Sequence, residues 1–408
     1  MSCDIAIVGG SFAGLSVARE ISQKCDANLV IIEEHPEIGK PASSSAFTFA
    51  DTVNQYRLES AVARYYSRVG YYSYLGSTAF FDLGGPKLAS LDCTRTCREL
   101  VNKSRRGNME ILSGARVIGV ARKNGKISIN ITGRTENTIS CGLLIDASGA
   151  SFLSARFFPF RIPSFYSHPY GFELENCEIP EDFLDQMSLF VGTQVGSGGG
   201  WFYPTTRTHC RFGIAEITRT PGFPVDRLEK YYDFAKRNMR PFSKMIENAK
   251  PVATEAGSIP AEPMKHLVSD NIMRVGDSAG HATPHFLEGV RPALDFGRLC
   301  GSVAAEAYQK RDYTKRFLQK YERLWHKRNK LSYLYLLSAG EVFFSYDDKG
   351  IEKTVISSAK ARLSPESYLT GLKGEKAFPY ALIATRPSVD YLRKFVRFAA
   401  NDLRWALE

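Results

Sequence analysis

The chain has 408 residues, 44% hydrophobic and 24% charged, which allows about two or three domains and excludes a disordered or fibrous protein. The formal net charge of +10 favours anionic partners, but the basic residues are dispersed and no nucleic-acid-binding motif is present. No apolar run reaches the roughly 18 residues of a membrane span and no signal peptide precedes the first predicted strand, so we expect a cytoplasmic protein. Eight scattered cysteines without a C-x-x-C pair predict reduced thiols and no metal site.

The beginning of the chain has the pattern of a β-α-β unit. Its predicted elements are a strand at 5–8, a turn at 9–14, a helix at 15–23 and a second strand at 29–32. Gly9 permits the tight turn, Gly14 lets the helix pack close to the strand, and the helix N-terminus faces a pyrophosphate. Ser11 replaces the usual middle glycine, and its hydroxyl is suited to a phosphate oxygen. The unit predicts a dinucleotide site with Glu33 on the ribose, and by itself it does not separate NAD from FAD.

Residues 34–155 continue the α/β pattern. A loop rich in proline and serine follows Glu33, and the segment 51–90 is an insertion dense in tyrosine and phenylalanine. The elements predicted beyond it are a helix at 94–103, a strand at 109–111, a hairpin of 115–121 and 127–131 around Asn124-Gly125, and a strand at 142–145. The last strand runs into the sequence DASG at 146–149, whose small residues let the backbone approach a cofactor.

Residues 156–265 form a second zone that is rich in proline and aromatic residues. Alternation at 188–195 and 210–217 predicts an antiparallel sheet, with a helix at 225–237. Between two of its strands we expect a glycine-rich bend at 196–204 that presents aromatic side chains to a flat or greasy ligand. Core packing of these aromatics is an equal alternative.

A second anchor follows at 271–277, where an apolar strand ends at Gly276 and Asp277 comes at once. A loop then leads to Gly289 and a long helix of small residues. The N–H groups of Gly289 and Val290 at the start of that helix favour a partly anionic group. Residues 312–408 are predicted to be mostly helical, with a helix at 315–338. The amphipathic stretch 390–407 either packs on the core or contacts a membrane surface.

In this order, residues 9–14, Glu33, 146–149 and 275–277 resemble FAD-dependent proteins built like p-hydroxybenzoate hydroxylase. Within that group the chain is similar to the geranylgeranyl reductase family. The stretches that carry this resemblance are 37–41, 257–261 before 275–280, 321–325 and the helical tail. It implies an α/β fold: a split Rossmann-like FAD-binding domain (1–155 and 266–311), an antiparallel substrate domain (156–265) and a C-terminal helical region (312–408).

The same resemblance implies a reaction, namely the saturation of C=C bonds of an isoprenoid chain on a lipid or prenylated molecule. Reduced FAD would deliver hydride from N5, with electrons from NAD(P)H or from a ferredoxin that the basic surface would suit. A location at the inner face of the membrane as a peripheral protein is consistent with it.

Carried over position by position, the resemblance and the glycine motif imply a set of FAD contacts. They are Gly9, Ser11, Ala13, Gly14, Glu33, Ser44, Ser45, Arg95, Val117, Asp277, Gly289 and Val290. The family's aromatic substrate motif, Y-x-W-x-F-P, corresponds to a stretch that implies a substrate wall of Trp201, Phe202, Tyr203 and Pro204.

Three departures from the family pattern surround the flavin. Ser44 stands where the family usually has a cysteine, and Arg95 substitutes for an arginine expected near Cys93. Glu288 makes a usually glycine-rich loop bulkier. Glu288 is therefore a candidate proton donor, and its alternative role is a pair with Arg291 at the start of the helix.

Three other functions fit the same residues. A flavin-dependent monooxygenase or halogenase shares 9–14 and Asp277, although a halogenase would have a W-x-W-x-I-P motif that 201–204 match only in part. A non-redox, carotenoid-cyclase-like flavoprotein would use Glu288 to protonate its substrate. A lipid-binding flavoprotein without enzymatic activity would hold FAD that no donor reduces.

Overall fold

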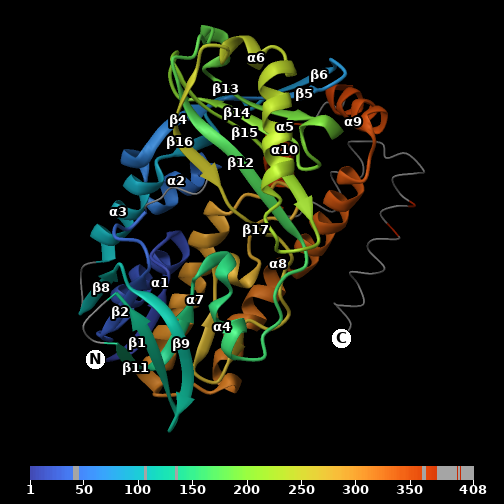
Figure 1. The fold of residues 1–408 in the computed structure, drawn as a ribbon. Coiled ribbons are helices and arrows are strands. Elements are labelled where there is room, and N and C mark those ends of the chain that lie inside the picture. Colours follow the sequence, from blue (N-terminus) through green and yellow to red (C-terminus); the bar gives the residue numbers. More distant parts are fainter. Residues whose placement is uncertain are drawn as a thin grey trace.

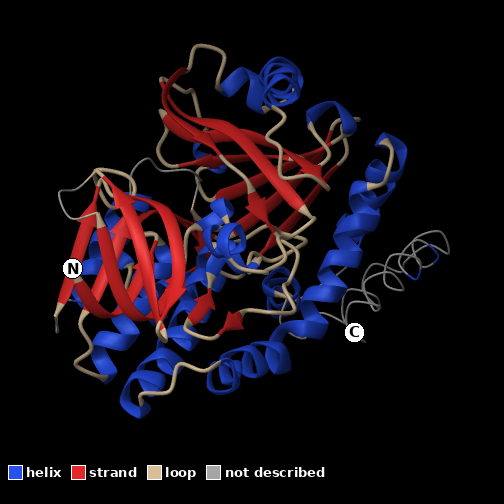
Figure 2. Ribbon diagram, turned by 60° about the horizontal axis from the view of Figure 1, so that its bottom comes forward, coloured by secondary structure: helices blue, strands red, loops and turns tan. Residues whose placement is uncertain are grey.

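Two large β-sheets form the body of the molecule. The computed structural model describes residues 1–39, 46–104, 108–133, 137–360 and 364–374, together with residues 393 and 396. One sheet lies near the N-terminus at the bottom of Figure 1 and the other lies at the top. Figure 2 shows the two sheets as separate layers, with helices packed against them. Each sheet has eight strands, and this arrangement confirms the predicted α/β fold with a Rossmann-like part, an antiparallel sheet and C-terminal helices.

The first sheet carries the predicted β-α-β unit. Its order is β18-β19-β11-β1-β2-β8, and the antiparallel hairpin of β9 and β10 extends it from β11. The bounds are β1 Ser2–Val8, β2 Leu29–Glu33, β8 Met109–Ser113, β9 Arg116–Lys123, β10 Lys126–Thr132, β11 Thr138–Asp146, β18 Val268–Ser269 and β19 Ile272–Arg274. Strand β1 runs parallel to both β2 and β11, and its apolar residues are buried on both faces, as in other parallel sheets.

Helices cover one face of this sheet at close range. They are α1 (Phe12–Lys24), α3 (Cys93–Ser104) and α7 (Val290–Lys310), and α1 packs between the other two. A Cβ on Gly14 would lie 2.0 Å from the carbonyl oxygen of Gly9, so only glycine fits there. Gly9 itself has a φ of +106°, a conformation that favours glycine. The tight turn and the close helix-to-strand packing predicted for these two glycines are therefore confirmed.

The second sheet has the order β16-β12-β15-β14-β13-β5-β6, with the short β17 paired to β12. Its strands are β5 Arg68–Ser73, β6 Thr78–Asp82, β12 Tyr166–Glu175, β13 Gln186–Val191, β14 Gly200–Pro204, β15 His209–Thr218, β16 Lys250–Ala256 and β17 Ile259–Pro260. The predicted helix is present as α5 (Val225–Asn238), which packs with α6 (Phe242–Met245) on the outer face. Strands β5 and β6 come from the aromatic segment 51–90, and β5 joins the sheet parallel to β13.

The prediction of a bend over 196–204 was wrong for the second half of that stretch. Residues 200–204 form β14, an inner strand between β13 and β15. The glycine at its start serves packing and not a turn, because a Cβ on Gly200 would lie 2.2 Å from the ring of Phe190. The turn lies earlier, where Gly196 and Gly199 have positive φ angles.

A small sheet and a helical segment complete the described chain. The order β3-β7-β4 joins β3 Phe47–Phe49, β7 Leu88–Leu91 and β4 Val62–Tyr66, and α2 (Ala50–Tyr56) follows β3 directly. The helix predicted at 315–338 is present and longer, as α8 (Lys315–Phe344), which starts against β18 at the first sheet. It leads to α9 (Asp348–Lys360) on β6 and then to α10 (Pro365–Lys373). A short α4 (Leu153–Phe157) follows β11.

One region of interest falls mostly beyond these ranges. The amphipathic stretch predicted at 390–407 lies outside the described residues apart from 393 and 396. Of the helices that the structure does describe, none is long and apolar enough to span a bilayer.

Candidate functional site

One cavity of about 1430 Å³ is lined by residues of both sheets and of the C-terminal helices. Drug-sized ligands occupy pockets of roughly 300–1,000 Å³. The cavity therefore has room for a dinucleotide and for a second, apolar molecule beside it. It has two chemically different ends, one formed by the β-α-β unit and the other by aromatic side chains of the second sheet.

The first end is a nucleotide cradle at the carboxyl edge of β1 and β2. The cavity lining there includes residues that the sequence analysis assigned to FAD, namely Gly9, Ser11, Ala13, Glu33 and Val117. The Glu33 carboxylate accepts hydrogen bonds from the backbone N–H of Gly10 at 2.7 Å and of His35 at 2.9 Å. These bonds hold the acid at the end of β2, where a ribose would lie. Ser11 is the N-cap of α1 and its side chain makes no capping hydrogen bond, which leaves the hydroxyl for a phosphate.

A second part of the cradle lies around the start of α7. Gly276 begins a one-turn helix after β19 and Asp277 follows it, bordering the cavity beside Gly289, the N-cap of α7. Burial raises the pKa of the Asp277 carboxyl to about 6. The first residue of α7 is Val290, so the positive end of a 21-residue helix faces the cavity. An electron-rich ring edge would be stabilised there.

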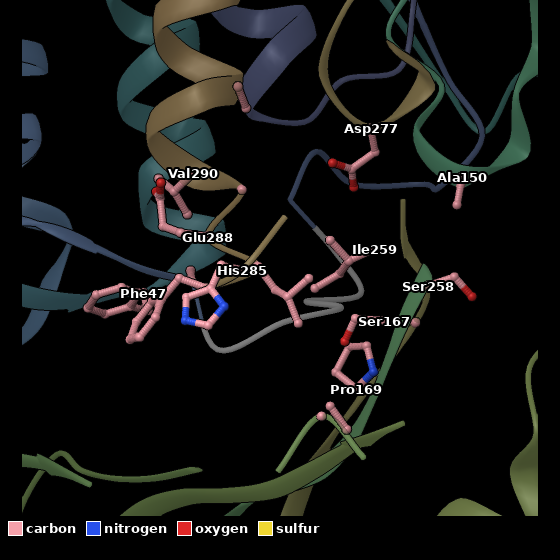
Figure 3. Close-up of a pocket in the computed structure, with 18 of the residues that line it drawn as sticks. Phe47, Ala150, Ser167, Pro169, Ser258, Ile259, Asp277, His285, Glu288 and Val290 are labelled. Atoms are coloured by element: carbon pink, nitrogen blue, oxygen red, sulfur yellow. The ribbon is translucent and has the colours of Figure 1, made fainter. Parts of the chain in front are cut away.

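Glu288 lies next to this helix start. Its Oε1 accepts a hydrogen bond from the backbone N–H of Arg291 at 2.6 Å and another from Thr48 Oγ1 at 3.4 Å, while the Arg291 Nε lies 3.6 Å from its Oε2. Burial raises the pKa of Glu288 to about 7 although Arg291 lowers it. The pair at the helix start, one of the two roles considered for Glu288, is thus present in the structure. Figure 3 shows Glu288 and His285 on one side of the pocket, with Ser167 and Pro169 on the other.

The second end of the cavity is apolar. Trp201 and Tyr203 of β14 line it together with Tyr71 and Phe81 of the inserted segment. Helix α10 closes it, because the Tyr368 ring stacks on Phe81 at 4.4 Å between centroids and its hydroxyl lies 2.9 Å from that of Tyr71. The result is an aromatic chamber next to the nucleotide cradle.

The structure corrects two members of the expected substrate wall. Phe202 is fully buried on the opposite face of β14, where its ring stacks on Phe242 at 4.9 Å between centroids. The reason is the period of two along a strand, which turns alternate side chains to opposite faces. Pro204 ends the strand outside the cavity lining, and its carbonyl accepts a hydrogen bond from the Tyr66 hydroxyl at 3.0 Å.

Arg95 is a further correction. Its side chain is 67% exposed and its Nε lies 3.6 Å from an Asp92 carboxylate oxygen on the outer face of α3. It does not line the cavity, whereas Cys93 and Cys97 of the same helix do. Gly14 also lies outside the lining because its function is packing beneath the turn. Ser44 and Ser45 fall outside the described residues.

We predict that Arg95→Ala leaves FAD affinity and the bound-flavin spectrum unchanged. The arginine is exposed and its ion pair with Asp92 is at the surface, where such pairs contribute about 0–1 kcal/mol. Titration of the apoprotein with FAD, followed by flavin fluorescence, measures the effect. A tenfold loss of affinity would show that Arg95 does reach the cofactor.

Several residues of the site gave little signal in the sequence. They are Tyr71, Phe81, Ser167, Glu255, His285, Tyr368 and Leu372. The aromatic density of 51–90 was a visible sign, but nothing in it indicated that the segment crosses to the second sheet. Leu372 and Tyr368 belong to α10, whose sequence has the ordinary composition of a surface helix.

Comparisons with known proteins agree with this geometry. Residues 3–196 match the family model for pyridine nucleotide-disulphide oxidoreductases. Digeranylgeranylglycerophospholipid reductase 1 of Methanococcoides burtonii is 28% identical over 374 residues, covering 87% of each chain. The digeranylgeranylglycerophospholipid reductase of Methanococcus vannielii is 24% identical, covering 80% of this chain and 83% of the relative.

Solved structures show the same fold. A geranylgeranyl bacteriochlorophyll reductase-like protein of Thermoplasma acidophilum superimposes with a TM-score of 0.81 at 19% identity, covering 94% of this chain and 98% of the other. A flavin-dependent brominase superimposes with a TM-score of 0.70 at 14% identity, covering 99% and 100%.

The glycine turn, Glu33 and the start of α7 form a cradle that fits FAD, and the fold around them defines an FAD-dependent oxidoreductase. The matches to archaeal lipid reductases, which cover 87% and 80% of this chain, indicate which oxidoreductases it resembles. The chain is thus an oxidoreductase that is similar to geranylgeranyl reductases, the resemblance that its sequence pattern indicated.

Proposed function

We propose that this protein saturates C=C bonds of an isoprenoid chain carried by a lipid or a prenylated small molecule. The observation that supports it best is the continuity of one cavity from the nucleotide cradle to an aromatic chamber. A polyprenyl chain is long, apolar and uncharged, and it suits a chamber walled by Trp201, Tyr203, Tyr71 and Phe81. The relatives named for digeranylgeranylglycerophospholipid reduction point to the same substrate class.

The chain would contribute binding and orientation to this reaction. Bound FAD, once reduced, supplies a hydride from its N5. Glu33 would hold a ribose, Ser11 a phosphate oxygen, and the N–H groups of Gly289 and Val290 the anionic edge of the ring. The aromatic chamber and α10 would keep water from the alkene, because apolar surface excludes it there.

Electrons would come from NAD(P)H or from a ferredoxin. The net charge of +10 favours association with an acidic electron-transfer protein. The same charge would favour peripheral contact with anionic lipid at the inner face of the membrane, where a lipid substrate would reside.

The experiment uses the FAD-loaded protein under anaerobic conditions. After reduction by dithionite, we expect an added geranylgeranyl lipid to reoxidise the flavin and to gain two hydrogens for each bond reduced, measured by absorbance and mass spectrometry. The fully saturated lipid is the control and should leave the flavin reduced. A flavin that stays reduced with the unsaturated lipid, or a product that gains oxygen only in air, would contradict the proposal. Replacing dithionite with NADPH or with reduced ferredoxin then identifies the donor.

A further inference from the structure

A buried carboxyl group faces the cavity from the edge strand of the second sheet. Glu255 lies on β16, where the preceding residues 250–254 are exposed and Glu255 alone is 3% exposed. Its Oε1 lies 3.3 Å from the Arg211 Nε on β15. Its Oε2 is closed to solvent and has no hydrogen-bond partner among the described residues. This oxygen has a hydrogen-bonding capacity that the described residues leave unused, and Glu255 is one of the residues that line the cavity.

Strand pairing places Glu255 beside the aromatic wall. Glu255 pairs with Gly171 of β12, Gly171 with Gly213 of β15, and Gly213 with Trp201 of β14. These four residues form one row across the sheet. The indole of Trp201 lies over Gly213, where a Cβ would be 2.3 Å from the ring. Because Gly171 also lacks a side chain, no side chain of this row stands between the indole and the Glu255 strand.

We propose that Glu255 is the acid that protonates the alkene carbon not attacked by hydride, and that Arg211 stabilises the carboxylate left behind. This inference rests on the proposed reductase function. One carbon of the double bond takes a hydride, which carries two electrons, from reduced flavin, and the other takes the proton of Glu255. The flavin is oxidised, the substrate gains two hydrogens, and Glu255 regains its proton from water.

The electrostatic surroundings suit an acid of this kind. Burial raises the pKa of Glu255 to about 7, Arg211 lowers it and Glu173 of β12 raises it. Cys93 of α3 and Tyr203 of β14 also face the group, and burial raises the pKa of each thiol or phenol so that both are neutral near pH 7. Glu255 is therefore about half protonated at neutral pH and largely protonated below it. Once the proton leaves, the guanidinium of Arg211 is already beside the new charge.

Two other carboxyl groups with raised pKa values, those of Asp277 and Glu288, border the cavity, but both lie outside the second sheet. Asp277 lies at the nucleotide end, beside the N-cap of α7. Glu288 accepts the N–H of Arg291 and so caps α7. Of the three, only Glu255 stands on the same sheet face as Trp201 and Tyr203, where an isoprenoid chain would lie.

The test compares FAD-loaded wild type with Glu255→Gln in a single turnover. Reoxidation of dithionite-reduced flavin by geranylgeranyl lipid should be about 10²–10⁴-fold slower in the variant, the usual range for a lost general acid. Dithionite reduction and lipid binding, followed by tryptophan fluorescence, should be unchanged. The acid must be protonated to react, so the wild-type rate should be full below pH 7 and fall about tenfold per pH unit above it, whereas the variant should lack this step.

A second measurement does not depend on turnover. The infrared difference spectrum of the unreduced protein between about pH 5 and about pH 9 should contain a carboxylic C=O band that disappears in Glu255→Gln. Glu255→Asp, which keeps the acid but withdraws it by one methylene, should retain the pH step with a lower rate. Glu173→Gln is the matched control, since this neighbouring carboxyl group does not line the cavity. It should keep the rate at low pH and the pH step, with the step moved to lower pH because Glu173 raises the pKa of Glu255.

The outcomes separate the two proposals. If wild type reduces the lipid and Glu255→Gln keeps its rate and pH profile, the role of Glu255 is wrong and the reductase function stands. Loss of the pH step in Glu288→Gln instead of Glu255→Gln would assign the proton to Glu288. If wild type itself is not reoxidised by the lipid, the reductase function and this inference both fall.

Discussion

Gly14→Val is expected to lower FAD affinity by at least about a hundredfold, or about 2.8 kcal/mol. A Cβ at position 14 would lie 2.0 Å from the carbonyl oxygen of Gly9, far inside the contact distance. Either α1 moves away from β1 or the Gly9 turn opens, and both changes displace the helix N-terminus that faces the pyrophosphate. Titration of the apoprotein with FAD and thermal unfolding with and without FAD measure the two consequences.

Gly222→Val is the matched control. This glycine lies in a surface connection, a Cβ there would meet nothing within 4 Å, and its φ is not positive. Its variant should bind FAD as wild type does and unfold at a similar temperature. Wild-type FAD affinity in Gly14→Val would mean that the turn does not hold the cofactor.

Substitutions of two neighbouring aromatic residues on β14, Phe202 and Trp201, are expected to affect different properties, stability in one case and lipid binding in the other. Phe202→Ala should lower the free energy of unfolding by about 3–5 kcal/mol, because the fully buried ring packs on Phe242 in the outer core. Trp201→Leu should destabilise the fold less and instead weaken lipid binding by about tenfold or more, since its indole lines the cavity. Denaturant unfolding and lipid titration of both variants measure the free energy of unfolding and the lipid affinity of each.

Each variant serves as a control for the other, because Phe202→Ala changes the outer face of β14 and Trp201→Leu changes the face that lines the cavity. Phe202→Ala protein that remains folded should bind lipid with near wild-type affinity. A loss of lipid binding in Phe202→Ala with unchanged stability would place the substrate on the other face of the sheet and would contradict the chamber described here.

Local sequence signals predicted the first sheet well. The alternation of apolar strands with helices, together with Gly9 and Gly14, predicted β1, α1 and β2 and their packing. The Asn124-Gly125 pair predicted the hairpin of β9 and β10, since both residues take the positive φ angles of a tight turn. Such features depend on neighbours in the sequence, so they can be read from the chain directly.

Features that depend on distant partners were missed. Gly200 resembled part of a bend because its packing partner, the ring of Phe190, lies on another strand. The parallel pairing of β5 with β13 joins residues more than a hundred positions apart and has no local signature. Glu255 stands in a polar edge strand, and only the fold reveals that Arg211 and α3 bury it. Arg95 was assigned to the cofactor by its position in the family pattern, whereas the helix turns it outward.

The pairing of β5 with β13 has a consequence for synthesis of the chain. The first sheet draws strands from residues 2–274, and the second draws strands from residues 68–260, which lie wholly inside that interval. No cut divides the chain into two pieces that each hold a complete large sheet. On the emerging polypeptide, β11 therefore lacks its neighbour β19 until the whole second sheet has been translated. Long-range contacts of this kind make folding slow, and the first sheet cannot be completed before β19 has been translated.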